Sequence, residues 1–169
     1  MRNCHSKPLR VQLPGHEVEA APPAPVPSRP EPRTPARGRV MVIDDEVVIR
    51  RTLERLLGKE HEVVLYATGQ EALDHLEQDP EFDVIVCDLM MPGLTGMDMY
   101  DTLGQRQPDL ASRMIFLTGG AFDERARHFF GRVDNIKLDK PFDIKGLRSV
   151  IRQQVSVVRA DGAERGRSS

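Results

Sequence analysis

The fold is decided by the stretch Val40-Met41-Val42-Ile43-Asp44-Asp45, in which four apolar residues run directly into two acids. A continuous apolar run of this length is typical of a strand that is buried on both faces of a parallel sheet. Carboxylates add nothing to the burial of such a strand, so their place at its carboxyl end needs another explanation. In a parallel α/β sheet these ends line one crevice, which is the usual place for a ligand.

Three further candidate strands also end in polar side chains: Asp88 after residues 84–87, Thr118 after 114–117 and Lys140 after 136–139. Each of these residues has an ordinary explanation when taken alone, such as a helix N-cap for an acid or a solvated cation for the lysine. Together, at matching strand ends, they have the composition of a metal-assisted phosphoryl site. Neighbouring carboxylates repel one another, and a hard cation such as Mg²⁺ removes that cost.

Amphipathic helical segments separate the candidate strands, and residues 61–66 supply one more strand. Right-handed crossovers fold five such strand–helix units as a doubly wound parallel sheet with helices on both faces. The most apolar strands should be central, and the mixed second and fifth strands should lie at the edges. We therefore predict an α/β fold with strand order 2-1-3-4-5, in which the aspartates meet between the first and third strands.

Composition divides the 169 residues into one folded segment and two margins. Nine of the 13 prolines precede Gly38, so we predict that residues 1–38 are a disordered Pro-rich linker. Residues 39–156 carry the strand and helix patterns and are the predicted domain. The polar segment 157–169 is predicted to be a disordered tail.

The overall charge and hydropathy exclude several classes of protein. A net charge of −2 gives no support to nucleic-acid or membrane-surface binding. No apolar run approaches the ~18 residues of a membrane span, and the first residues lack the apolar core of a signal peptide. No Gly-rich phosphate loop appears, which argues against a nucleotide site. We expect a cytoplasmic protein, in which Cys87 is a buried small hydrophobe.

Four motifs carry a resemblance to a known family: Val42-Ile43-Asp44-Asp45-Glu46, the run from Asp88 to Gly96, Thr118-Gly119 and Lys140-Pro141-Phe142. Together they resemble the response-regulator receiver domain of two-component signalling. The resemblance implies a flavodoxin-like fold and transfer of a phosphoryl group from a kinase phosphohistidine to an aspartate. The implied partners are a sensor histidine kinase or a histidine phosphotransfer domain, and an unknown downstream protein.

The resemblance also implies roles for the acids. Asp88 would be the phosphoacceptor. Mg²⁺ or Mn²⁺ would be bound directly by Asp45, Asp88 and the backbone carbonyl of Met90, whereas Asp44 would act through metal-bound water.

Thr118 and Lys140 would contact the phosphoryl group, and Lys140 would pair with Asp88 beforehand. The family holds the Lys–Pro bond cis, so Lys140–Pro141 is expected to be cis. Many receivers carry an aromatic switch residue three positions before this lysine, where the chain has Lys137. We hypothesise that the chain relays its phosphoryl group or signals through another surface.

Three functional classes stay open. The chain is a phosphorelay receiver, either free-standing or from a hybrid sensor kinase, or a degenerate receiver that acts as an interaction module without phosphorylation. The third class, a phosphohydrolase, needs a general acid–base two residues after the nucleophile, where Met90 stands. We therefore expect no enzyme, only self-phosphorylation from a donor and slow autodephosphorylation.

Overall fold

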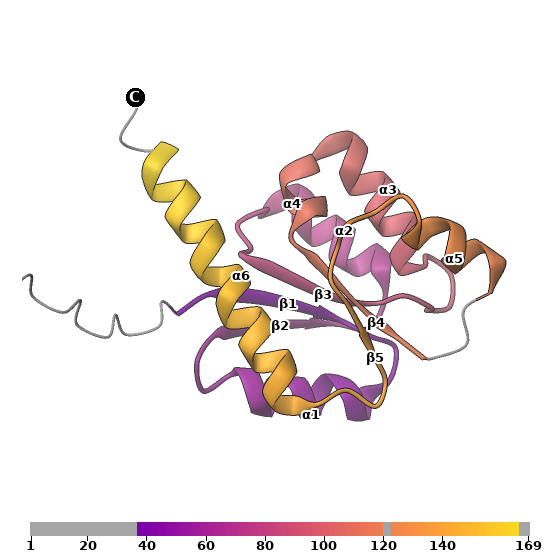
Figure 1. Cartoon of the computed structure of the whole chain (residues 1–169), viewed down its shortest axis with the longest axis horizontal. Coiled ribbons are helices and arrows are strands. Elements are labelled where there is room, and N and C mark those ends of the chain that lie inside the picture. The colour runs from indigo at the N-terminus through magenta and orange to yellow at the C-terminus, as the bar shows by residue number, and fades with distance from the viewer. Residues whose placement is uncertain (1–36, 120–122, 166–169) are drawn as a thin grey trace, which may run out of the picture. The chain divides into compact units, whose positions relative to one another are not determined.

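A computed structural model describes residues 37–119 and 123–165, which form a parallel sheet with helices on both faces (Figure 1). The strands are β1 (Arg39–Ile43), β2 (Glu62–Tyr66), β3 (Val84–Asp88), β4 (Met114–Thr118) and β5 (Lys137–Asp139). The helices are α1 (Val47–Leu57), α2 (Gly69–Gln78), α3 (Gly96–Arg106), α4 (Pro108–Ser112), α5 (Glu124–Phe130) and α6 (Ile144–Arg165). The Pro-rich linker stays a prediction, because residues 1–36 lie outside the described residues.

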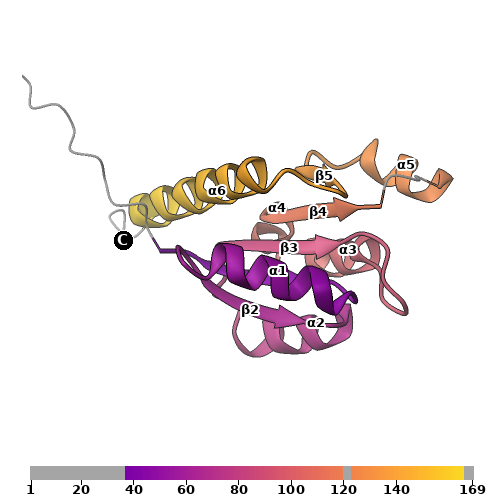
Figure 2. The ribbon, with the colours of Figure 1, turned by 90° about the horizontal axis from the view of Figure 1, so that it is seen from below.

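The predicted strand order is confirmed. The five strands are arranged β2-β1-β3-β4-β5, and every neighbouring pair is parallel (Figure 2). Strands β3 and β4 are buried along their whole length, whereas β5 alternates between exposed and half-buried residues, as expected for an edge strand. The apolar runs therefore lie in the middle of the sheet, where both faces are covered.

Each face of the sheet has its own apolar core (Figures 1 and 2). On one face, α1 and α6 pack against the strands through Leu53, Leu57, Leu147, Ile151 and Val155. On the other face, α2, α3 and α5 pack against the strands through buried side chains that include Leu76, Met99, Leu103 and Phe129. Burial of these side chains fixes the sheet between two helical layers, and so fixes the strand ends that carry the polar residues.

The register of the sheet brings the predicted site residues together at the carboxyl ends of the strands. Asp44 directly follows β1, and Asp88 is the last residue of β3. The pairings Ile43↔Cys87 and Thr118↔Asp139 align the carboxyl ends of β1 with β3 and of β4 with β5. The side chains that follow these pairs are therefore neighbours in space although they are far apart in the sequence.

The loop after β3 depends on two glycines. Gly93 has a φ of 76°, a left-handed conformation that glycine adopts without strain. A Cβ on Gly96 would lie 2.5 Å from the backbone oxygen of Asp88, so only glycine lets α3 begin this close to β3. Thr95 and Asp98 form a reciprocal capping box at the start of α3. The loop that carries Met90 is thereby held at both ends.

The predicted margins need correction where the structure describes them. The prediction of a disordered tail over residues 157–169 is wrong for residues 157–165, because α6 continues to Arg165, and residues 166–169 lie outside the described residues. Val158 is half-buried, and the guanidinium of Arg159 lies 3.0 Å from Asp83, so this turn is fastened to the sheet. Gly38, assigned by the prediction to the linker, is buried, and its N–H donates a hydrogen bond to Nδ1 of His61 at 3.2 Å.

The short helix α4 is not among the predicted elements. It begins at Pro108, which occupies the first helical turn, and buries Leu110 and Ala111. Five residues are too few for the helical spacing of apolar side chains to stand out from a loop.

Candidate functional site

Three aspartates meet at the carboxyl ends of β1 and β3. Asp44, Asp45 and Asp88 place carboxylate oxygens within 4.8 Å of one another. Asp44 is completely buried and Asp88 is 6% exposed, whereas Asp45 is exposed to solvent. Oxygen ligands at this separation are those that a hard divalent cation takes in proteins. The cluster could therefore hold a metal ion, as the sequence predicts.

The carboxylates of Asp44 and Asp45 differ in their partners. Asp44 accepts a hydrogen bond from the N–H of Glu46 on Oδ1 and one from Nζ of Lys140 on Oδ2, both at 2.8 Å. The exposed carboxylate of Asp45 makes no hydrogen bond or ion pair within the described residues. Asp45 is thus free to bind a cation directly, while both oxygens of Asp44 are already engaged.

Lys140 brings a positive charge to the same crevice from the end of β5. Its Nζ lies 2.8 Å from Asp44, 3.4 Å from Oδ2 of Asp88 and 3.4 Å from Oε1 of Glu46. The predicted pairing with Asp88 is confirmed, and so is the cis bond between Lys140 and Pro141. Glu46 lies within one of the four motifs, but no role was predicted for it.

The charges in this crevice are unbalanced. Burial raises the pKa of Asp88, and the adjacent charge of Asp44 raises it further, against the opposing effects of Lys140 and the N–H of Met90. Burial alone would lower the pKa of Lys140, but its hydrogen bond to Asp44 and the charge of Asp88 outweigh burial and raise it. The three clustered aspartates and the exposed Glu46 carry four negative charges against one ammonium, so a divalent cation would neutralise most of the excess negative charge.

Thr118 ends β4 and is 2% exposed. Its hydroxyl donates a hydrogen bond of 2.7 Å to Oδ1 of Asp139. The sequence predicts Thr118 at a phosphoryl site, and the structure places it at the correct strand end with its hydroxyl bonded to a β5 acid. Asp139 is a residue that the sequence analysis missed as part of the site.

Met90 lies two residues beyond β3, and its side chain is 51% exposed. Its backbone N–H donates a hydrogen bond to the carboxylate of Asp88. The neighbouring Cys87 is a free, buried thiol whose pKa is raised by burial. This agrees with the prediction that Cys87 is a packing residue.

Lys137 occupies the position of the missing aromatic residue. It is exposed, and its Nζ lies 4.9 Å from the ring centre of Phe130 on α5. Phe130 packs in turn against Phe116 and Phe129, with ring centres 6.0 and 5.4 Å apart. An aromatic side chain from α5 therefore lies beside β5, where the strand itself supplies a lysine.

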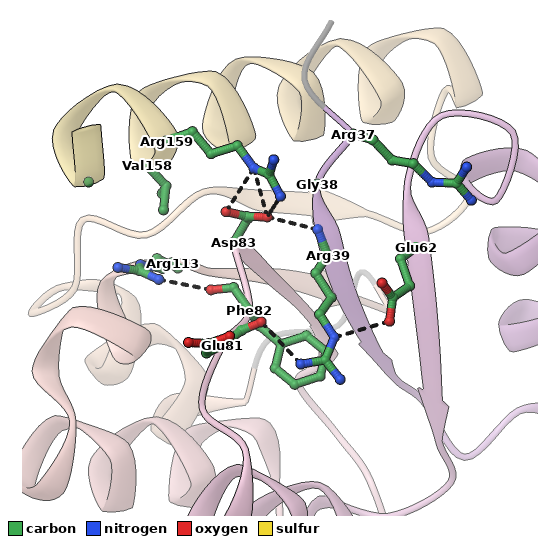
Figure 3. Close-up of a pocket in the computed structure, with 11 residues that line it drawn as sticks. Arg37, Gly38, Arg39, Glu62, Glu81, Phe82, Asp83, Arg113, Val158 and Arg159 are labelled. Carbon is green, nitrogen blue, oxygen red and sulfur yellow. Dashed lines mark hydrogen bonds and ion pairs between the residues drawn. The ribbon is translucent and has the colours of Figure 1, made fainter. Parts of the chain in front are cut away.

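A pocket of about 550 Å³ lies at the opposite edge of the sheet, where the strands begin (Figure 3). Four of its charged side chains form two ion pairs: Arg39 Nε lies 3.2 Å from Glu62, and Arg159 lies 3.0 Å from Asp83. The Arg159–Asp83 pair joins α6 to the residue before β3, whereas the Arg39–Glu62 pair joins β1 to β2. The pocket contains none of the predicted site residues.

Comparison with known proteins places this fold in a family. Residues 40–152 match the response regulator receiver domain, so the chain belongs to the response regulator receiver family of two-component signalling. A solved receiver domain protein from Clostridium thermocellum has 26% sequence identity and a TM-score of 0.65, over 73% of this chain and 98% of the other. The predicted fold class and family are therefore confirmed.

Curated relatives place the same domain in larger proteins. Sensor kinase CckA of Brucella abortus is 30% identical over 118 residues, which are 69% of this chain and 12% of the relative. The DNA-binding transcriptional regulator NtrC of Escherichia coli is 31% identical over 121 residues, which are 71% of this chain and 25% of the relative. The chain thus spans a quarter or less of the length of these two relatives. Among the described residues, no helix is long and apolar enough to cross a membrane.

Proposed function

We propose that this receiver domain accepts a phosphoryl group from a phosphohistidine onto Asp88, with the help of a divalent cation, and passes the signal on through protein contacts. The observation that carries this proposal is the position of Asp88. Its carboxylate lies 3.4 Å from the ammonium of Lys140 and within 4.8 Å of two further aspartates. A carboxylate nucleophile, a cation and a metal-binding cluster are the groups that phosphoryl transfer to an aspartate requires.

In the transfer, an oxygen of Asp88 donates an electron pair to phosphorus while the bond from phosphorus to the imidazole nitrogen breaks. The electron pair of the broken bond stays with the imidazole, which takes up a proton and leaves as the neutral ring. The product on this chain is an acyl phosphate. Lys140 holds one phosphoryl oxygen, and the hydroxyl of Thr118 can donate to another once it leaves Asp139.

We assign the divalent cation, Mg²⁺ or Mn²⁺, to Asp45, Asp88 and the backbone carbonyl of Met90. Asp44 would act through a water on that cation, because its two oxygens already accept hydrogen bonds from the N–H of Glu46 and from Lys140. The cation, when bound, neutralises the acids and the negative oxygens of the transferring group.

Hydrolysis of the acyl phosphate on Asp88 should be slow. Met90, two residues after Asp88, has no group that can move a proton to or from an attacking water. The acyl phosphate should therefore persist long enough to carry a signal. We assign the chain no catalytic turnover beyond its own phosphorylation and slow autodephosphorylation.

The phosphodonor must reach a carboxylate that is only 6% exposed, so it must dock closely around the crevice. Val47 and Val48 at the start of α1 are 59% and 75% exposed, and Met90 is 51% exposed. Exposed apolar side chains in such positions suit a protein partner. We assign this surface to a sensor histidine kinase or a histidine phosphotransfer domain, and we place the exchange in the cytoplasm, where the thiol of Cys87 stays reduced.

Phosphoramidate, a small donor with a phosphorus–nitrogen bond, tests the chemistry without a protein partner. With Mg²⁺, the intact mass should show one added phosphoryl group per chain, and EDTA should abolish the addition. Asp88→Asn should take up none. Asp134→Asn, which changes an exposed carboxylate outside the cluster, should behave as the wild type. An unlabelled wild-type chain would contradict the proposal and favour an interaction module that works without phosphorylation.

A further inference from the structure

The hydrogen bond between Thr118 and Asp139 bears on how the receiver changes state. The two residues are paired in register across β4 and β5, and the Thr118 hydroxyl lies 2.7 Å from Oδ1 of Asp139. Thr118 is 2% exposed, whereas Asp139 is exposed on the edge strand. The bond therefore joins a buried side chain at the crevice to a carboxylate on the protein surface.

A threonine hydroxyl has one proton to donate. In the structure that proton goes to Asp139, so it is not available to a phosphoryl oxygen on Asp88. A bond to an ionised acceptor is also stronger than one to a neutral acceptor. The phosphoryl group therefore competes with Asp139 for a single donor.

The side-chain bond is separable from the strand pairing. The N–H of Lys140 donates to the carbonyl of Thr118 at 2.6 Å, and the N–H of Phe116 donates to the carbonyl of Ile136 at 2.9 Å. These backbone bonds hold β5 to β4 without help from the carboxylate of Asp139. Loss of that carboxylate should free the hydroxyl and leave the sheet intact.

We propose that Asp139 is a positioning residue, which holds the Thr118 hydroxyl in the unphosphorylated orientation and is released at the β5 surface when a phosphoryl group takes the hydroxyl. This proposal rests on the proposed function, because it needs a phosphoryl group on Asp88. Phosphorylation would then change the surface of β5 by releasing the Asp139 carboxylate, without an aromatic residue at position 137.

Two measurements test it. The first needs no phosphoryl group: NMR coupling constants report the χ1 rotamer of Thr118 in the metal-free, unphosphorylated protein. The wild type should show one dominant rotamer, and Asp139→Ala should show an average of several. An unchanged rotamer in Asp139→Ala overturns the proposal.

The second measurement is the affinity for beryllofluoride with Mg²⁺, since this ion mimics a phosphoryl group on a carboxylate. Asp139→Ala should bind it about three- to tenfold more tightly, which is the size expected for one competing hydrogen bond at a partly exposed site. Asp134→Ala removes an exposed charge nearby in the sequence and should change the affinity less than twofold, within the margin expected for a surface substitution.

A double-mutant cycle separates the hydrogen bond from the charge of Asp139. In a Thr118→Val background, Asp139→Ala should no longer tighten beryllofluoride binding. An equal gain in both backgrounds overturns the proposal, because the effect then comes from charge alone. Failure of phosphoramidate to label the wild type overturns the proposed function instead, and the rotamer measurement distinguishes the two failures.

Discussion

Lys140 and Asp44 form an ion pair of 2.8 Å between residues 96 positions apart in the chain. The carboxylate of Asp44 is completely buried, and the side chain of Lys140 is 15% exposed. The same ammonium lies 3.4 Å from Asp88. This pairing links the end of β1 to the end of β5, and it makes Lys140 the counter-ion of two buried acids, with the exposed Glu46 also 3.4 Å from its ammonium.

Replacement Lys140→Met should destabilise the metal-free protein by about 1–3 kcal/mol, because Asp44 and Asp88 lose a charged donor while they stay buried. Mg²⁺ should restore part of the loss, since it supplies positive charge to the same cluster. Urea unfolding with and without Mg²⁺ measures both effects. Lys145→Met, at an exposed position on α6, is the matched control. A Lys140→Met protein as stable as the control contradicts this role.

Divalent cations should stabilise the folded chain through Asp45. At a Mg²⁺ concentration of 100 times its dissociation constant, the free energy of unfolding should rise by about 2.7 kcal/mol. Asp45→Asn should lose most of this gain, because the exposed carboxylate is the cluster member without another partner among the described residues. Asp134→Asn should keep it. Equal stabilisation of Asp45→Asn and the wild type by Mg²⁺ would place the cation elsewhere.

His61 should make stability fall at mildly acidic pH. Burial lowers its pKa below the ordinary value of 6.5, and the charge of Arg152 lowers it further. A histidine with a lowered folded pKa contributes its full stability above about pH 6.5, and this contribution is lost as the pH falls toward the folded pKa. Protonation of Nδ1 would also remove the acceptor for the N–H of Gly38.

Chemical denaturation between pH 7 and pH 5 measures this dependence. The wild type should lose more stability over this range than His61→Asn, which has no group to titrate there. His128→Asn, a change at an exposed position on α5, should keep the wild-type dependence. Identical pH profiles for the wild type and His61→Asn would show that His61 is not the titrating group.

The exposed valines of α1 should affect phosphoryl transfer from a protein donor but not labelling by a small donor such as phosphoramidate. Val48→Asp puts a charge on a residue that is 75% exposed, so it should leave the fold and phosphoramidate labelling unchanged. Transfer from a phosphorylated histidine kinase that labels the wild type should slow about tenfold, the effect of one lost apolar contact of 1–2 kcal/mol. Val157→Asp, on the exposed side of α6, is the control. Unchanged transfer to Val48→Asp would move the docking surface away from α1.

The sequence was sufficient to predict where a site residue lies when its position follows from the backbone alone. Asp44, Asp88 and Thr118 follow apolar runs, and parallel strands bring such ends together whatever the side chains do. The cis bond before Pro141 was also expected, but from the resemblance rather than from the residues.

Side-chain orientation and long-range contacts could not be predicted in this way. The hydroxyl of Thr118 bonds to Asp139 because of the register between β4 and β5, which the two segments do not reveal separately. The extension of α6 brings Arg159 to Asp83, 76 residues away in the chain. From its local composition alone, a polar segment that is held by such a contact cannot be told apart from a frayed tail.

The most direct test of the central claim is to identify the phosphorylated residue. After treatment with phosphoramidate and Mg²⁺, borohydride reduction converts an aspartyl phosphate into homoserine, and tandem mass spectrometry of the peptides locates it. We predict conversion at Asp88 alone, and none in the presence of EDTA. Conversion at Asp44 or Asp45, or no conversion at any aspartate, would contradict it.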